Sequence, residues 1–98
     1  NTIKSDSSGI RGKGYREFFG AIACAPQGNS QDSLLSLYFY DTVSGSMVLL
    51  DQVSISPGDS YVWNHEDYGM RLENSGYIQA VAGNAPCAIW IKTKDRLF

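Results

Sequence analysis

Apolar and polar residues alternate in short runs along most of this chain, and turn residues separate the runs. The clearest run, residues 35–40, reads Leu-Ser-Leu-Tyr-Phe-Tyr. A period of two places leucine and phenylalanine on one face of an extended strand and serine and tyrosine on the other. After Ser44-Gly45-Ser46 the alternation resumes through Met47–Ile55, so the two runs predict a β-hairpin.

The remaining apolar runs predict five further short strands: Phe18–Pro26, Tyr61–Trp63, Met70–Glu73, Tyr77–Ala82 and Cys87–Thr93. Ser56-Pro57-Gly58-Asp59 carries proline and glycine at the second and third positions, as a type II turn requires. Gly83–Pro86 predicts a turn that closes a last hairpin. Short segments at spacings of roughly ten residues, without a helical apolar stripe, predict an all-β antiparallel β-sandwich, jelly-roll or immunoglobulin-like.

The beginning of the chain is rich in serine, glycine and basic residues and shows no apolar period. We therefore expect a flexible basic N-terminal arm over residues 1–16, followed by a single β-sandwich domain over residues 17–98. A chain of 98 residues suffices for one two-layer core but not for separate cofactor and substrate domains.

Charge is sparse and unevenly distributed. Only 18% of the residues are charged, which suggests neutral faces that another subunit covers. Residues 1–17 sum to +2, residues 18–91 to -6 and residues 92–98 to +2, for a net charge of -2. Two interpretations stay open: both basic ends are solvated tails, or the basic arm docks on an acidic neighbour, such as Asp41, Asp51 or Glu66 of another copy.

The same composition limits the classes of partner. An acidic balance gives no overall footprint for duplex nucleic acid, so we expect no direct nucleic-acid contact. No apolar run approaches the ~20 residues that cross a bilayer, and no secretory signal pattern is visible, so we expect no membrane partner.

Motifs that suggest catalysis or metal binding are weak. Gly58-Asp59-Ser60 resembles an esterase nucleophile block, but its serine is expected inside a Pro-Gly turn, and His65 is the only histidine. His65 with Glu66 and Asp67 does not supply the four N or S ligands of a closed zinc site. We therefore expect no enzymatic activity, no catalytic residue, no metal and no cofactor.

Two further groups of residues leave alternatives open. Cys24 and Cys87 permit one disulfide, but their small apolar neighbours favour buried free thiols. Four aromatic residues can form a platform for a sugar or a single-stranded nucleic acid, or can lie in the core or a subunit interface. These residues are Tyr38, Tyr40, Tyr61 and Trp63.

Residues 18–91 resemble a family of small structural proteins from tailed-bacteriophage virions. The resemblance rests on four blocks: Ala21–Ala25, Ile55–Ser60, Leu72–Ala80 and Asn84–Ile91. It implies a β-sandwich that serves as a head-decoration, head-to-tail joining or tail-accessory subunit. It also implies a location in the virion after assembly in the host cytoplasm, and contacts with capsid, portal or tail proteins.

The function that we expect is therefore assembly, by symmetric self-association into a homo-oligomer and docking on a protein shell. The predicted subunit or shell interface comprises Arg11, Lys13, Arg16, Tyr38, Tyr40, Tyr61 and Trp63. The alternative is a carbohydrate-binding β-sandwich module that uses surface tryptophan and tyrosine, with Trp63 as the central ring.

Overall fold

A computed structural model describes residues 1–10, 13–64, 70–72 and 76–98 of the chain. All regular structure in these residues is β-strand. The strands are β1 (Thr2–Ser5), β2 (Gly14–Cys24), β3 (Ser33–Asp41), β4 (Ser46–Ile55), β5 (Ser60–Asn64), β6 (Met70–Leu72), β7 (Tyr77–Gly83) and β8 (Ala88–Leu97).

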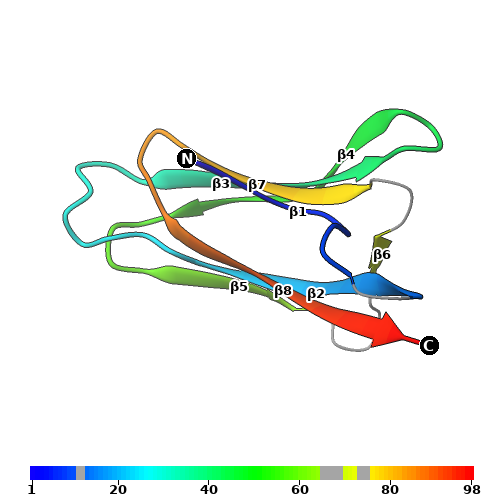
Figure 1. Ribbon diagram of the computed structural model, residues 1–98. Helices are drawn as coiled ribbons and strands as arrows, with labels where there is room; N and C mark the ends of the chain where they lie inside the picture. The colour runs from blue at the N-terminus through cyan, green and yellow to red at the C-terminus, as the bar shows by residue number, and fades with distance from the viewer. Residues whose placement is uncertain (11–12, 65–69, 73–75) are drawn as a thin grey trace.

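The strands form two antiparallel sheets that pack face to face (Figure 1). Sheet A has the order β1-β7-β3-β4. In sheet B, β2 is central: β8 runs along one side of it, while β5 and β6 share the other side. The predicted antiparallel β-sandwich is therefore confirmed.

The core lies between the sheets and is filled from alternate strand positions. Leu35 and Leu37 of β3 are 2% and 1% exposed, as the alternation in the sequence predicts. They belong to one apolar cluster with Ala21 and Ala23 of β2. Small side chains on one strand and large ones on another allow the layers to interdigitate without voids.

The central hairpin and the turn after it form as the sequence predicts. β3 pairs with β4 along its whole length, from Ser33 opposite Ile55 to Asp41 opposite Ser46. In the turn before β5, the N–H of Asp59 donates to the carbonyl of Ser56 at 2.9 Å. Gly58 has a φ of 87°, which a type II turn needs at its third position and which glycine adopts without strain.

The predicted last hairpin is wrong. β7 pairs with β1 and β3 in sheet A, whereas β8 pairs with β2 in sheet B. The segment Gly83–Pro86 thus crosses from one sheet to the other instead of closing a hairpin. Turn residues reverse the chain locally, but the partner of each strand depends on the packing of the whole sandwich.

The predicted flexible arm is wrong for the residues that form strands. β1 pairs with β7 from Thr2 opposite Val81 to Ser5 opposite Ile78. The backbone of Asn1 extends this ladder by hydrogen bonds in both directions with Ala82. Its side chain holds the segment before β8, because its Nδ2 donates to the carbonyl of Cys87 and its Oδ1 accepts from the N–H of Cys87. The sandwich therefore begins at its first strand, β1, and not at residue 17.

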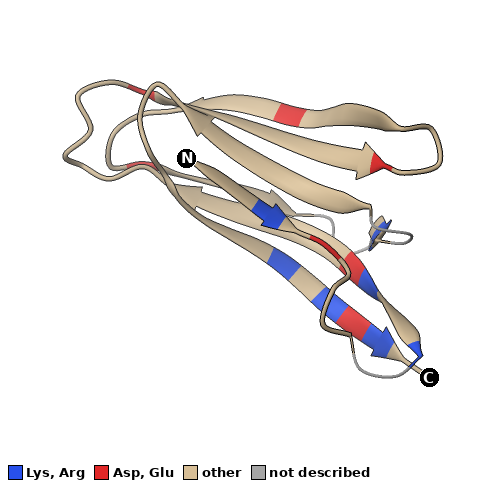
Figure 2. Ribbon diagram, turned by 45° about the horizontal axis from the view of Figure 1, so that its top comes forward, with Lys and Arg blue, Asp and Glu red and all other residues tan. Residues whose placement is uncertain are grey.

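The basic C-terminal end is also ordered, since β8 extends to Leu97 opposite Gly14. Lys and Arg gather along β8 and the adjoining end of β2, while most of sheet A carries few charges (Figure 2). The interpretation of residues 92–98 as a solvated tail is therefore wrong for the residues that belong to β8.

Candidate functional site

Arg16, a predicted interface residue, is bound within its own chain. Its Nε and Nη2 donate to the two carboxylate oxygens of Asp95 at 2.6 and 3.0 Å. Its Nη1 donates to the carbonyls of Asp6 and Ser8 at 2.9 and 2.8 Å. The hydrogen bonds from Arg16 hold the pKa of Asp95 below its ordinary value. Arg16 thus joins β2 to β8 and holds the segment after β1.

The other two basic residues of the predicted arm interface are Lys13 and Arg11. Lys13 is exposed, and its carbonyl accepts a hydrogen bond from the N–H of Phe98 at 2.9 Å. Arg11 lies outside the described residues.

The predicted acidic docking partners bind groups within their own chain. Asp41 accepts hydrogen bonds from the N–H of Val43 and the hydroxyl of Ser44, which lower the pKa of its carboxyl. Asp51 accepts hydrogen bonds from the hydroxyl of Tyr61 and the N–H of Gln52. Glu66, the third partner, lies outside the described residues.

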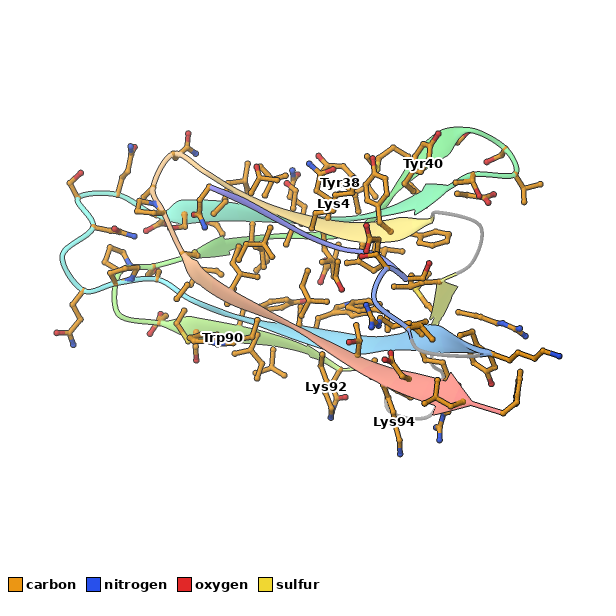
Figure 3. All side chains as sticks on the ribbon, in the orientation of Figure 1. Lys4, Tyr38, Tyr40, Trp90, Lys92 and Lys94 are labelled. Atoms are coloured by element: carbon orange, nitrogen blue, oxygen red, sulfur yellow. The ribbon has the colours of Figure 1, made fainter. Side chains whose placement is uncertain are left out.

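The four aromatic residues of the predicted platform divide between two places. Tyr38 and Tyr40 lie on the outer face of sheet A, near Lys4 (Figure 3). The ring of Tyr40 stacks on Tyr77 at a centroid distance of 5.0 Å, and the ammonium of Lys4 lies 3.9 Å from the Tyr77 centroid. These contacts join side chains of three neighbouring strands on the outer face of sheet A.

Tyr61 and Trp63 instead face the other sheet. Their Cα partners in β2 are Ala23 and Ala21, which are both buried between the sheets. Trp63 stacks on the fully buried Phe18 at a centroid distance of 5.1 Å. A single platform of all four rings is therefore wrong, and Trp63 is part of the core packing.

The hydroxyl of Tyr61 donates to a carboxylate oxygen of Asp51 and so links β5 in sheet B to β4 in sheet A. Burial of the phenol, followed by its hydrogen bond to the carboxylate, raises the pKa of Tyr61 to about 12. A neutral hydroxyl beside a carboxylate keeps its proton, so this link between the sheets is intact at neutral pH.

An exposed apolar segment lies on β4, the outermost strand of sheet A. We call Ser46–Leu49 the β4 edge segment. Met47, Val48 and Leu49 are 45%, 46% and 50% exposed. Among the described residues β4 pairs with β3 alone, so the backbone groups along its other side have no strand partner there.

A second exposed surface lies on β8, and the sequence analysis did not find it. The β8 face consists of the outward side chains Trp90, Lys92, Lys94 and Arg96, all of them exposed. Figure 3 shows Trp90, Lys92 and Lys94 on the side of sheet B away from sheet A. The signal was present as a tryptophan and three cations at alternate positions, but the predicted strand ended at residue 93.

The β8 face continues across the outer surface of sheet B. Trp90 pairs with Ile22 of β2, which pairs in turn with Val62 of β5. These three side chains are 59%, 41% and 59% exposed and form an apolar row. In the next row Lys92 and Asn64 flank Gly20.

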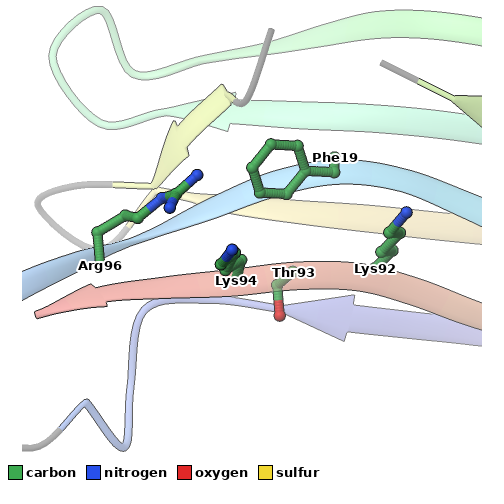
Figure 4. Close-up of a pocket in the computed structure, with 5 residues that line it drawn as sticks. All are labelled: Phe19, Lys92, Thr93, Lys94 and Arg96. Carbon is green, nitrogen blue, oxygen red and sulfur yellow. The ribbon is translucent and has the colours of Figure 1, made fainter. Parts of the chain in front are cut away.

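Two hollows adjoin at Lys92. A small one of about 80 Å³ lies around Gly20, between Lys92 and Asn64. A larger one of about 360 Å³ is lined by Phe19 and the three cations of β8, together with Thr93. Figure 4 shows the ring of Phe19 between Arg96 and Lys92.

The structure also bears on the candidate chemistry. Ser60 is exposed at the start of β5, and His65, Glu66 and Asp67 lie outside the described residues. Within the described residues, no three His, Cys, Asp or Glu side chains gather in a way that could hold a metal ion. Cys24 and Cys87 are free thiols, of which Cys87 is buried and Cys24 is half-buried.

No helix long and apolar enough to cross a membrane occurs in the part of the chain that the structure describes. Comparison with known proteins gives no match to a protein-family model, to a curated protein or to a solved structure.

Proposed function

We propose that this chain is a non-enzymatic structural subunit of a tailed-bacteriophage virion, either a capsid-decoration protein or a neck or tail accessory protein. It acts by associating with further copies of itself and by docking on a protein shell. The virion assignment is supported by the resemblance of residues 18–91 to such subunits. The mode of action is supported by the β4 edge segment, which is the observation that carries the proposal.

The β4 edge segment combines two properties that favour association. Along one side its backbone has no strand partner in the part of the chain that the structure describes, and three consecutive apolar side chains are about half exposed. Soluble proteins usually protect such an edge with lysine, proline or a covering segment, because an open edge pairs with other chains. Ser46–Leu49 contains neither lysine nor proline.

The β4 edge segment is short because the regular pairing of β4 with β3 is interrupted after Leu49. Leu50 is an extra residue in the pairing with β3, and Asp51 follows with its carboxylate bound to Tyr61. A bulge and an inward-pointing charge both oppose further edge pairing. Two copies paired antiparallel through Ser46–Leu49 would join their A sheets and bury Met47, Val48 and Leu49, in a symmetric contact that both copies share.

The test is sedimentation velocity over a range of concentrations with the double variant Val48→Lys, Leu49→Lys. We expect the wild-type chain to sediment as an oligomer. We expect the variant to dissociate at concentrations at least roughly tenfold higher, because like charges would face each other across the contact.

Val43→Lys is the matched control. Val43 is 86% exposed in the turn before β4, so a valine-to-lysine change there adds a positive charge outside the paired segment. The control should sediment like the wild type. A wild-type chain that stays monomeric at millimolar concentration, or a control that dissociates as much as the double variant, contradicts self-association through β4.

The virion assignment has its own test, because a protein can self-associate without belonging to a virion. Purified phage particles that encode this chain should contain it in many copies, as quantified by mass spectrometry of the intact particles. Absence of the chain from particles that are otherwise complete contradicts the assignment, whatever the result for β4.

A further inference from the structure

The β8 face has the composition of a binding surface rather than of a solvated strand. Trp90 is the most exposed ring on sheet B, at 59%. Three cations follow it at alternate positions, which places them on one side of the strand about 6.8 Å apart. A large exposed aromatic next to aligned cations can stack on a ring and pair with anions at the same time.

The surface around Trp90 is exposed, and an apolar row and two hollows follow one another along β8. Ile22 and Val62 extend the apolar surface beside the indole across two neighbouring strands. Farther along β8 lie the notch at Gly20 and the hollow of about 360 Å³ beside Phe19. An extended ligand that follows β8 would therefore meet an apolar row first and a cationic hollow next (Figure 4).

The local charge is opposite to that of the rest of the chain. Of the acidic residues that the structure describes, Glu17 shares this part of the face, where its Oε1 accepts from Nε of Arg96 at 3.1 Å. Asp95 points to the other side of β8, where it is paired with Arg16. Counting only residues that the structure describes, Lys92, Lys94 and Arg96 against Glu17 give the β8 face a net charge of +2, whereas residues 18–91 of the sequence sum to -6.

We propose that the β8 face binds an acidic polysaccharide. A sugar ring stacks on the indole of Trp90, and carboxylate or sulfate groups of the following sugars contact Lys92, Lys94 and Arg96. The side-chain amide of Asn64, across the notch from Lys92, is placed to hydrogen-bond a sugar hydroxyl.

Two observations favour a polysaccharide over a single-stranded polynucleotide. Affinity for a polynucleotide comes mainly from the number of phosphates that basic side chains neutralise, and the strip offers only three cations on an acidic protein. The apolar row directly beside Trp90 is aliphatic, with Ile22 and Val62, and the next ring, Phe19, lies separately in the hollow that the cations of β8 line. Aliphatic neighbours instead suit the C–H face of a pyranose ring, which packs on the electron-rich face of an indole.

The site is independent of the β4 edge segment, which lies in the other sheet. Its test is isothermal titration calorimetry of the full chain with polygalacturonate, dextran sulfate, neutral dextran and a thirty-nucleotide oligo-dT. We expect at least one of the two acidic polysaccharides to bind, with an affinity that falls as salt rises, and neutral dextran to bind at least tenfold more weakly.

Three variants locate the site. Trp90→Ala should weaken binding roughly tenfold, and Trp90→Phe should recover part of the loss because a ring is retained. Lys92→Ala with Lys94→Ala should weaken binding at least as much and flatten the salt dependence. Lys4→Ala is the matched control, since Lys4 is an exposed lysine on an edge strand of the opposite sheet, and it should leave binding unchanged.

Thermal unfolding of each variant checks that the fold is retained, which we expect because Trp90 is largely exposed. The proposal is overturned if neither acidic polysaccharide binds at low salt, or if Lys4→Ala weakens binding as much as the double lysine variant. It is also overturned if oligo-dT binds more tightly than both acidic polysaccharides.

Discussion

β4 and β8 are equivalent in position and opposite in chemistry. Each is a ten-residue strand at the edge of its sheet, and each pairs with one neighbour among the described residues. β8 carries three cations on its outer face, whereas β4 exposes Met47, Val48 and Leu49. Charged side chains, lysine above all, oppose pairing with a further strand. We therefore propose that these two edges serve different tasks, with β8 binding a ligand and β4 binding another strand.

The two edges also differ in where a bulge lies. In β4 the extra residue is Leu50, in the edge strand itself. At β8 the extra residue is Phe19, in the central strand β2. The end of β4 that lies beyond its bulge bends away from sheet B, while β8 stays against β2 over its whole length (Figure 1). The bulge therefore exposes apolar surface at one edge and contributes a ring to a hollow at the other.

The largest effect on the stability of the β8 edge is expected for Gly20→Ala, a substitution directly after the Phe19 bulge. A Cβ at Gly20 would overlap the carbonyl oxygen of Trp63, so β5 would have to move. We expect a loss of at least ~2 kcal/mol in the free energy of unfolding, because overpacking against backbone cannot relax in a side chain. Urea denaturation measures it.

Gly28→Ala is the control, because a Cβ there has no heavy atom within 4 Å. It should change the free energy of unfolding by less than ~0.5 kcal/mol. Equal stability of the two variants would show that the β2 bulge tolerates a side chain, and that glycine does not shape this edge.

A smaller effect is expected at the link between β4 and sheet B. Tyr61→Phe removes the hydroxyl that donates to Asp51, and we expect the free energy of unfolding to fall by about 1 kcal/mol at pH 7. The folded pKa of Tyr61 is raised from 10.0 to about 12. Its contribution is therefore complete below pH 10 and is lost as the pH rises through about 12.

Ultraviolet titration of the tyrosines tests this assignment directly. One phenol of the six in the chain should titrate near pH 12, and Tyr61→Phe should abolish that late phase. If the variant instead removes a phenol that titrates near pH 10, the link between β4 and β5 does not hold in solution.

The smallest effect is expected at β8, where Asp95→Asn breaks the ion pair with Arg16. The folded pKa of Asp95 is lowered from 3.8, mainly by hydrogen bonds from Arg16. The stabilisation is therefore present above pH 3.8 and is lost as the pH falls through the lower folded value. Thermal unfolding should show a lower melting temperature for the variant at pH 7, and the difference should shrink in acid.

As a control, Asp59→Asn makes the same charge change in the turn before β5, at the opposite end of sheet B from Asp95. A difference between wild type and Asp95→Asn that persists unchanged in strong acid would contradict the assignment of the ion pair.

Local pattern predicted the parts of the fold that depend on neighbours in sequence. The alternation over residues 35–40, the β3–β4 hairpin and the turn at Gly58 all follow from short-range rules. The ends of β2 and β8 were missed because their charges suggested solvent. Those charges are cross-strand partners: Arg16 binds Asp95, and Arg96 binds Glu17. Such pairing becomes visible only when strands distant in sequence are aligned.

The candidate site was predicted less well than the fold. Trp63 was chosen as a surface ring and lies against Phe18, while Trp90, which was not chosen, is exposed. Both tryptophans lie in strands, and the choice between the inner and outer face depends on register. For β5 and β8 the register is set by β2, which pairs with both. A one-residue change in register would exchange the faces.

The pairing of Gly14 with Leu97 has a consequence for how the molecule folds during synthesis. Sheet B cannot close until β8 has emerged, and non-local pairing of this kind is slow, with folding times of milliseconds to seconds for β-sandwiches. β3 and β4 are the consecutive strands that pair with each other among the described residues, so their hairpin can form early. Its apolar edge would then be open on a nascent chain, and an early partner for β4 would protect that chain from aggregation.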